Sequence, residues 1–178
     1  MASYHVSVLL LDHEICSLAY SQGISQIEDW TFIYNESLRV HLIDTPGFDD
    51  TTKKAVEVLR DIAGWLGVTY KKSILLSGLI YLHPISDNRL RGSALRNLCM
   101  FKKLCGPECI PGIVLATTMW ALVDPEDGLK RETQLRSNDD FWGGMEKGGS
   151  IVMRHQRTKE SALAILEVII GNRKQIVL

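Results

Sequence analysis

The sequence predicts one α/β domain with a three-layer arrangement, in which helices cover both faces of a mostly parallel sheet with an antiparallel edge hairpin. Apolar strand-like runs alternate with helical patterns almost to the C-terminus. Two of these runs, 30–34 and 39–43, are separated only by a turn cluster, which is typical of a hairpin. The longest apolar run, 74–82, suits a strand that is buried on both faces.

Composition and charge restrict the class of protein. The 178 residues fit a single domain over 1–178, and 46% apolar and 23% charged residues are typical of a globular protein. The net charge of −1 argues against a nucleic-acid partner. The apolar runs are too short for a membrane span or a signal peptide. Four cysteines without a C-x-x-C pair predict reduced thiols in a cytoplasmic protein.

The first half of the chain predicts the strands of the sheet's hairpin side. Residues 6–11 favour a strand, and the hairpin follows. A helical apolar pattern covers 50–66, with Gly67 directly after it as a predicted helix end. A buried strand over 73–82 then ends at His83-Pro84, since proline removes a backbone donor.

The second half predicts alternating helices and strands. In order, we expect a helix over 93–104, a strand over 110–119, a helix over 125–136, irregular chain around 141–144, a short strand over 150–154 and a helix over 161–170. Asp124 followed by Pro125 predicts a helix N-cap and first helical position.

The first chemical motif is Asp44-Thr45-Pro46-Gly47, which follows an apolar strand and precedes a helix. An Asp at a strand tip, three residues before a Gly, is how GTPases hold Mg²⁺ and sense the γ-phosphate. Asp44 would lie near the metal, and the Gly47 N–H would donate to the phosphate. The alternative is an Asp helix cap with a Pro-Gly turn.

The second motif is the end of the 110–119 strand. In G domains the matching strand ends in [NT]-K-x-D, whose Asp pairs with the N1 and N2 donors of guanine. Here Thr118 takes the first position, Met119 replaces Lys and Ala121 replaces Asp. Guanine selectivity should therefore be weak unless Asp124 swings in, and a plain strand tip is the alternative.

Two further candidates lie in predicted loops. Ser25 precedes the hairpin, where a hydroxyl of a working GTPase would bind Mg²⁺, and the favoured alternative is a solvent-exposed loop serine. Arg89 follows the 73–82 strand and could meet a phosphate or a partner's carboxylate, or belong to a solvated loop. The sequence contains no G-x-x-x-x-G-K-[ST] phosphate loop.

A series of segments over 21–171 resembles a family of fungal G-domain proteins. These are GTPases of the P-loop superfamily, similar to the immunity-associated and septin-like GTPases. The segments that carry the resemblance are Leu42–Thr51, Ser77–His83, Ile85–Arg89, Gly92–Leu98, Thr117–Trp120, Phe141–Trp142 and Arg154–His155.

The resemblance implies a Ras-like G domain of the P-loop NTPase fold, with GTP or GDP and Mg²⁺ as ligands and hydrolysis of GTP as the reaction. Asp44 and Gly47 would be the catalytic residues, Asp44 and Ser25 the metal side. Thr45, Gly47 and Thr118 would contact the nucleotide. The family's phosphate loop precedes the matched region, so residues 1–20 are an atypical start and the domain is expected to be N-terminally incomplete.

The expected function is a GTP-binding protein of GTPase descent with impaired binding and hydrolysis. One alternative is a pseudo-GTPase that acts as a protein-interaction module through residues 48–54 and 87–96. Its partner would be another protein or a second G domain. The other alternative is a truncated gene product without its phosphate loop.

Overall fold

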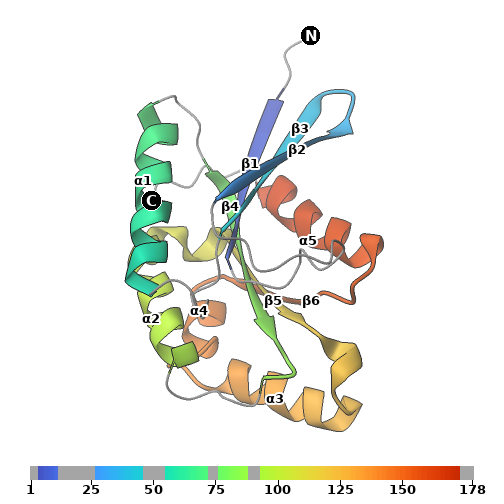
Figure 1. The fold of residues 1–178 in the computed structure, drawn as a ribbon. Coiled ribbons are helices and arrows are strands. Elements are labelled where there is room, and N and C mark those ends of the chain that lie inside the picture. The colour runs from blue at the N-terminus through green and yellow to red at the C-terminus, as the bar shows by residue number, and fades with distance from the viewer. Residues whose placement is uncertain (1–3, 12–26, 46–54, 72–75, 88–92, 173–178) are drawn as a thin grey trace.

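The computed structural model describes residues 4–11, 27–45, 55–71, 76–87 and 93–172 (Figure 1). They form a six-stranded sheet with the order β2-β3-β1-β4-β5-β6. The strands are β1 Tyr4–Leu11, β2 Glu28–Asn35, β3 Leu38–Asp44, β4 Leu76–Pro84, β5 Ile113–Thr118 and β6 Ile151–Arg154. β2 is antiparallel to β3 and every other pairing is parallel, so the predicted sheet with its edge hairpin is confirmed.

Helices cover both faces of this sheet (Figure 1). They are α1 Ala55–Lys71, α2 Ser93–Cys105, α3 Pro125–Ser137, α4 Gly143–Lys147 and α5 Lys159–Asn172, with 3-10 turns η1 Pro107–Gly112 and η2 Trp120–Leu122. The helices α1, α2 and α4 lie on one face and α5 on the other. No helix of the described segments is long and apolar enough to cross a bilayer.

The strand β1 lies in the middle of the sheet, between β3 and β4. Its Val8 is fully buried and pairs with Leu42 on one side and Gly78 on the other. The predicted strand over 6–11 is therefore confirmed, and it holds a central position between parallel neighbours.

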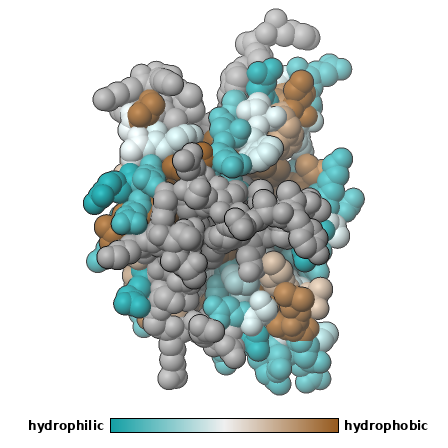
Figure 2. Space-filling view, in the orientation of Figure 1, coloured by the Kyte–Doolittle hydropathy of each residue, from teal (hydrophilic) through white to brown (hydrophobic). Residues whose placement is uncertain are grey.

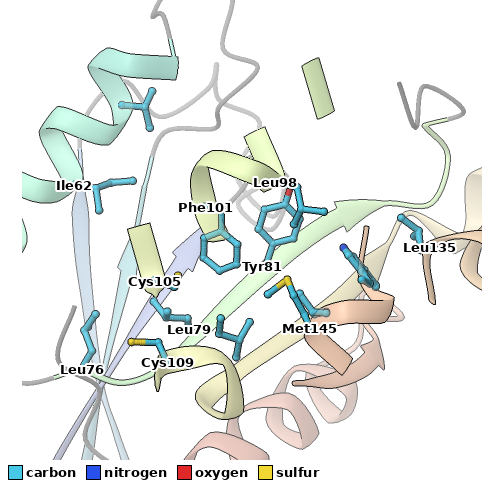
Figure 3. Packing of buried hydrophobic residues seen from close by; sticks show 14 of the residues in the cluster. Ile62, Leu76, Leu79, Tyr81, Leu98, Phe101, Cys105, Cys109, Leu135 and Met145 are labelled. Atoms are coloured by element: carbon cyan, nitrogen blue, oxygen red, sulfur yellow. The ribbon is translucent and has the colours of Figure 1, made fainter. Parts of the chain in front are cut away.

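Two apolar clusters join the layers. The larger one lies between the sheet and the helices α1, α2 and α4, where Tyr81 stacks on Phe101 with ring centroids 5.0 Å apart (Figure 3). The smaller one lies under α5. There, Gly78 lets the helix approach closely, because a Cβ at this position would lie 2.5 Å from the Ile169 side chain.

Element ends are where the sequence-based expectations were wrong. The helix α1 continues past Gly67 to Lys71, because nothing lies near the missing Cβ and an exposed glycine costs a helix only about 0.5–1 kcal/mol. The strand over 110–119 starts only at Ile113, since η1 occupies the preceding residues. The irregular stretch includes α4, and β4 runs through Pro84.

Candidate functional site

Parallel strands end at a common edge of the sheet, where open α/β sheets bind ligands. The last residues of β3, β5 and β6 are Asp44, Thr118 and Arg154. Two of the residues singled out from the sequence thus come to one edge. Ser25, Gly47 and Arg89 lie outside the described residues, so their predicted roles stay predictions.

Asp44 and Thr118 share one face of the sheet. Val114 and Ala116 belong to the cluster under α5, so the alternation of a strand places Thr118 on that face too. Leu42 packs against the same cluster, and Asp44 follows it by two residues. Thr45, the next candidate, is buried with 1% of its surface exposed.

The Thr118 side chain has an unusual environment for a hydroxyl. It is 3% exposed, and its Oγ1 has no hydrogen-bond partner among the described residues. A buried polar group without a partner costs about 1–3 kcal/mol, and such groups in native proteins are rare. The Thr118 hydroxyl is therefore a polar group at the end of β5 whose hydrogen-bonding capacity the described residues leave unused.

The turn after β5 holds the position of the base-reading Asp. Met119 has a left-handed backbone (φ 59°), and η2 then carries Ala121, which is exposed. Asp124, the alternative acceptor, is used elsewhere: its Oδ1 accepts a hydrogen bond from the Glu126 N–H at 2.9 Å as the N-cap of α3. The predicted cap is confirmed, and this carboxylate is engaged away from Ala121.

A polar network that the sequence did not reveal supports this turn. The Trp120 Nε1–H donates to Thr117 Oγ1 at 3.0 Å, and the Arg154 guanidinium lies over the Trp120 ring at 4.3 Å. The Arg154 Nε donates to Glu132 Oε1 at 2.9 Å, and Thr117 Oγ1 donates to the same oxygen at 3.4 Å. Three elements, β5, α3 and β6, are thereby held together.

A cavity of about 330 Å³ opens beside this network. The residues that line it are Trp120, Ala121, Pro125, Leu129, Arg154, Gln156 and Arg157. Most of the lining is apolar, with two guanidinium groups and one amide. The cavity thus lies at the carboxyl ends of β5 and β6, next to Ala121.

His83 is, after Thr118, the second buried side chain of the described residues with a polar atom that has no hydrogen-bond partner. It lies at the end of β4 with its ring edge-on to Trp142, with ring centroids 5.9 Å apart. Its Nε2 has no hydrogen-bond partner among the described residues. Burial lowers the pKa of His83 to about 4, although the nearby Asp87 charge opposes this shift.

This histidine predicts a loss of stability in acid. Between pH 6.5 and pH 4 the unfolded chain binds a proton at His83 that the folded protein excludes, so stability falls as pH falls. The contribution of His83 to the free energy of unfolding should decrease by about 2 kcal/mol between pH 7 and pH 5. Urea unfolding of His83→Gln should show a flatter pH dependence than the parent protein.

Burial and the Arg157 charge lower the pKa of His155 as well, so a shallower slope of the same sign should remain in the variant. An unchanged slope in His83→Gln would show that His83 is not the group responsible.

The comparisons with known proteins show which fold this site belongs to. No family model and no curated protein matches the sequence. Among solved structures, Toc33 from Arabidopsis thaliana in complex with Mg²⁺ and GMPPNP matches with a TM-score of 0.73 and 16% identity, over 99% of this chain and 89% of that one. The chain has the fold of G-domain GTPases.

Other G domains support the same fold. Toc33 with GDP and Mg²⁺ has a TM-score of 0.71 and 17% identity, over 97% of this chain and 87% of that one. Era from Aquifex aeolicus bound to GDP and AlF4⁻ has a TM-score of 0.59 and 7% identity, over 100% of this chain and 62% of that one. The Ras-like, P-loop NTPase fold predicted from the sequence is confirmed. Its finer resemblance to fungal, immunity-associated and septin-like proteins stays a prediction.

Proposed function

We propose that this chain is a nucleotide-binding protein of GTPase descent, which binds a nucleoside triphosphate with Mg²⁺ but holds GTP weakly and hydrolyses it negligibly. The observation that supports a ligand site is the buried, unpartnered Thr118 hydroxyl on the same sheet face as Asp44. Asp44 and Thr118 are separated by three strand-to-strand spacings across the sheet and by four residues along the strand direction. This corresponds to a distance of roughly 19 Å. This span suits an extended ligand such as a nucleotide.

The metal would lie at the Asp44 end. Mg²⁺ prefers oxygen ligands and is commonly held by one or two carboxylates together with substrate phosphates and waters. The Asp44 carboxylate, in a residue that is 8% exposed at the end of β3, is an oxygen ligand of this kind. When bound, Mg²⁺ would neutralise charge on the phosphates. The chain's own part would be to hold the ion at the end of β3 through the Asp44 carboxylate.

The weakness for GTP follows from the residues at the base end. Ala121 has no acceptor for the N1 and N2 donors of guanine, and Asp124 is engaged as a helix cap. An unpaired buried donor costs about 1–3 kcal/mol. The sequence also contains no G-x-x-x-x-G-K-[ST] loop to hold the phosphates, which accounts for the negligible hydrolysis.

A binding experiment tests this function. A fluorescent GTP analogue titrated in Mg²⁺ should bind the parent chain only above micromolar concentrations. Ala121→Asp restores the acceptor and should tighten binding about 5- to 150-fold, as about 1–3 kcal/mol implies. Leu122→Asp is the matched control. Leu122 is 66% exposed and does not line the cavity, so this substitution adds the same charge outside the site. Sub-micromolar binding by the parent chain would contradict the proposal.

A second candidate is a pseudo-GTPase that works by protein contact, as a binding module or a G-domain dimer. It is favoured by β2, the outermost strand, whose Trp30 and Ile33 are 55% and 72% exposed. One Toc33 structure is of a dimerization-deficient mutant, and another study links dimerization to GTPase activity in Toc33 and Toc159. Most of the surface expected from the sequence, 48–54 with 87–96, lies outside the described residues.

Thermal unfolding with and without a series of nucleoside triphosphates and Mg²⁺ separates the two candidates. A ligand that binds only the folded state raises the melting temperature, whereas a pure contact module shows no shift with any nucleotide. Sedimentation of the parent chain and of Ile33→Lys would then show whether β2 joins two copies.

A further inference from the structure

We propose that the cavity beside Ala121 accepts a base with two carbonyl oxygens, the uracil or xanthine type, in preference to guanine or adenine. This proposal rests on the nucleotide-binding function proposed above and names the base that the site would accept. The base preference is based on the cavity lining, which has hydrogen-bond donors on its polar wall and no carboxylate among the described residues.

The cavity has two unlike walls. Trp120, Ala121, Pro125 and Leu129 form the apolar one, which suits the flat faces of a base. Figure 2 shows a hydrophobic area at the lower right of this face of the molecule, over the segment that joins β5 to α3. The flat face of a base would therefore contact apolar side chains.

The polar wall supplies donors. A guanidinium group has five N–H donors and no acceptor. Arg154 uses its Nε and Nη2 on Glu132, and its Nη1 has no hydrogen-bond partner among the described residues. Arg157 adds a second guanidinium to the lining, and the Gln156 amide can donate or accept.

The nearby carboxylates do not add hydrogen-bond acceptors to the cavity wall. The Glu132 oxygens accept from Arg154 and Thr117, and Asp124 caps α3. Neither residue lines the cavity. A guanine site has an Asp acceptor at position 121, whereas this site has arginine donors in its lining and no acidic side chain among the described lining residues.

The bases differ in what they present to such a wall. On the edge that faces position 121 in a guanine site, guanine presents two donors, the N1–H and the N2 amine, with O6 as its one acceptor, and adenine presents the N6 amine beside the single acceptor N1. Uracil and xanthine present two carbonyl oxygens on either side of a ring N–H. Buried donors that find no acceptor are costly, and a site built for hydrogen bonding rejects a mismatched ligand strongly.

Calorimetric titration in Mg²⁺ with XTP, UTP, GTP, ATP and inorganic tripolyphosphate tests the proposal on the whole chain. XTP or UTP should bind at least tenfold tighter than GTP and ATP. Ala121→Asp should reverse the order in favour of GTP, while Leu122→Asp should keep the order of the parent chain.

The other outcomes separate the two proposals. GTP binding as tightly as XTP and UTP, or all nucleotides binding no better than tripolyphosphate, would overturn the base preference and leave triphosphate binding standing. Binding of none of the five would overturn both the base preference and the proposed function.

Discussion

Trp142→Ala is expected to lower the free energy of unfolding by about 3–5 kcal/mol. The indole is fully buried in the larger apolar cluster, and its removal leaves a cavity against His83 and the α4 backbone that the rigid sheet cannot close. The backbone N–H of residue 142 donates to the Leu135 carbonyl at 3.0 Å, and this bond remains in the variant. Urea unfolding followed by circular dichroism measures the change.

Trp30→Ala is the matched control for this experiment. It removes the same side chain from β2, where Trp30 is 55% exposed, and should cost less than about 1 kcal/mol. Equal losses in the two variants would show that the cluster around Trp142 does not hold the sheet against α4.

Glu132→Ala is the second large effect and should cost about 2–3 kcal/mol. The Glu132 side chain is 8% exposed and accepts a two-point hydrogen bond from Arg154. Removing it leaves the guanidinium over Trp120 without its counter-charge. Because the Arg154 side chain is 40% exposed, water replaces part of the lost interaction, and the cost stays below that of a fully buried pair.

The Arg136–Glu146 pair offers a control with the same chemistry at the surface. Its side chains are 47% and 32% exposed, so Glu146→Ala should cost no more than about 1 kcal/mol. Chemical denaturation of both variants gives the comparison. If Glu132→Ala is as mild as its control, the network does not support the turn after β5, and the emission of Trp120 should then stay unchanged as well.

Local patterns in the sequence were sufficient for most of the sheet. The hairpin was predictable because a turn cluster joins two apolar runs with a period of two residues, and both signals act between near neighbours. The cap of α3 was predictable for the same reason, since Asp124 bonds an N–H two residues away. Helix ends depend on what surrounds them, which is why Gly67 did not end α1.

The candidate site was predictable only in part. Asp44 and Thr118 were found because strand tips in α/β sheets are readable from apolar runs and from the motif that follows them. Glu132 was missed, since an isolated acid in a polar helix gives no signal of burial. The buried His83 ring was likewise unreadable, because its environment is formed by Trp142, a residue distant in the sequence.

The sequence by itself determined the alternation of strands and helices, the hairpin and the absence of an acceptor at position 121, because each is a property of neighbouring residues. Only the tertiary structure decided that β1 is central, that Asp124 is engaged as a cap, and that Arg154, Glu132 and Trp120 meet beside a donor-lined cavity. These features depend on contacts between segments far apart in the chain, and such contacts form only when packing brings the segments together.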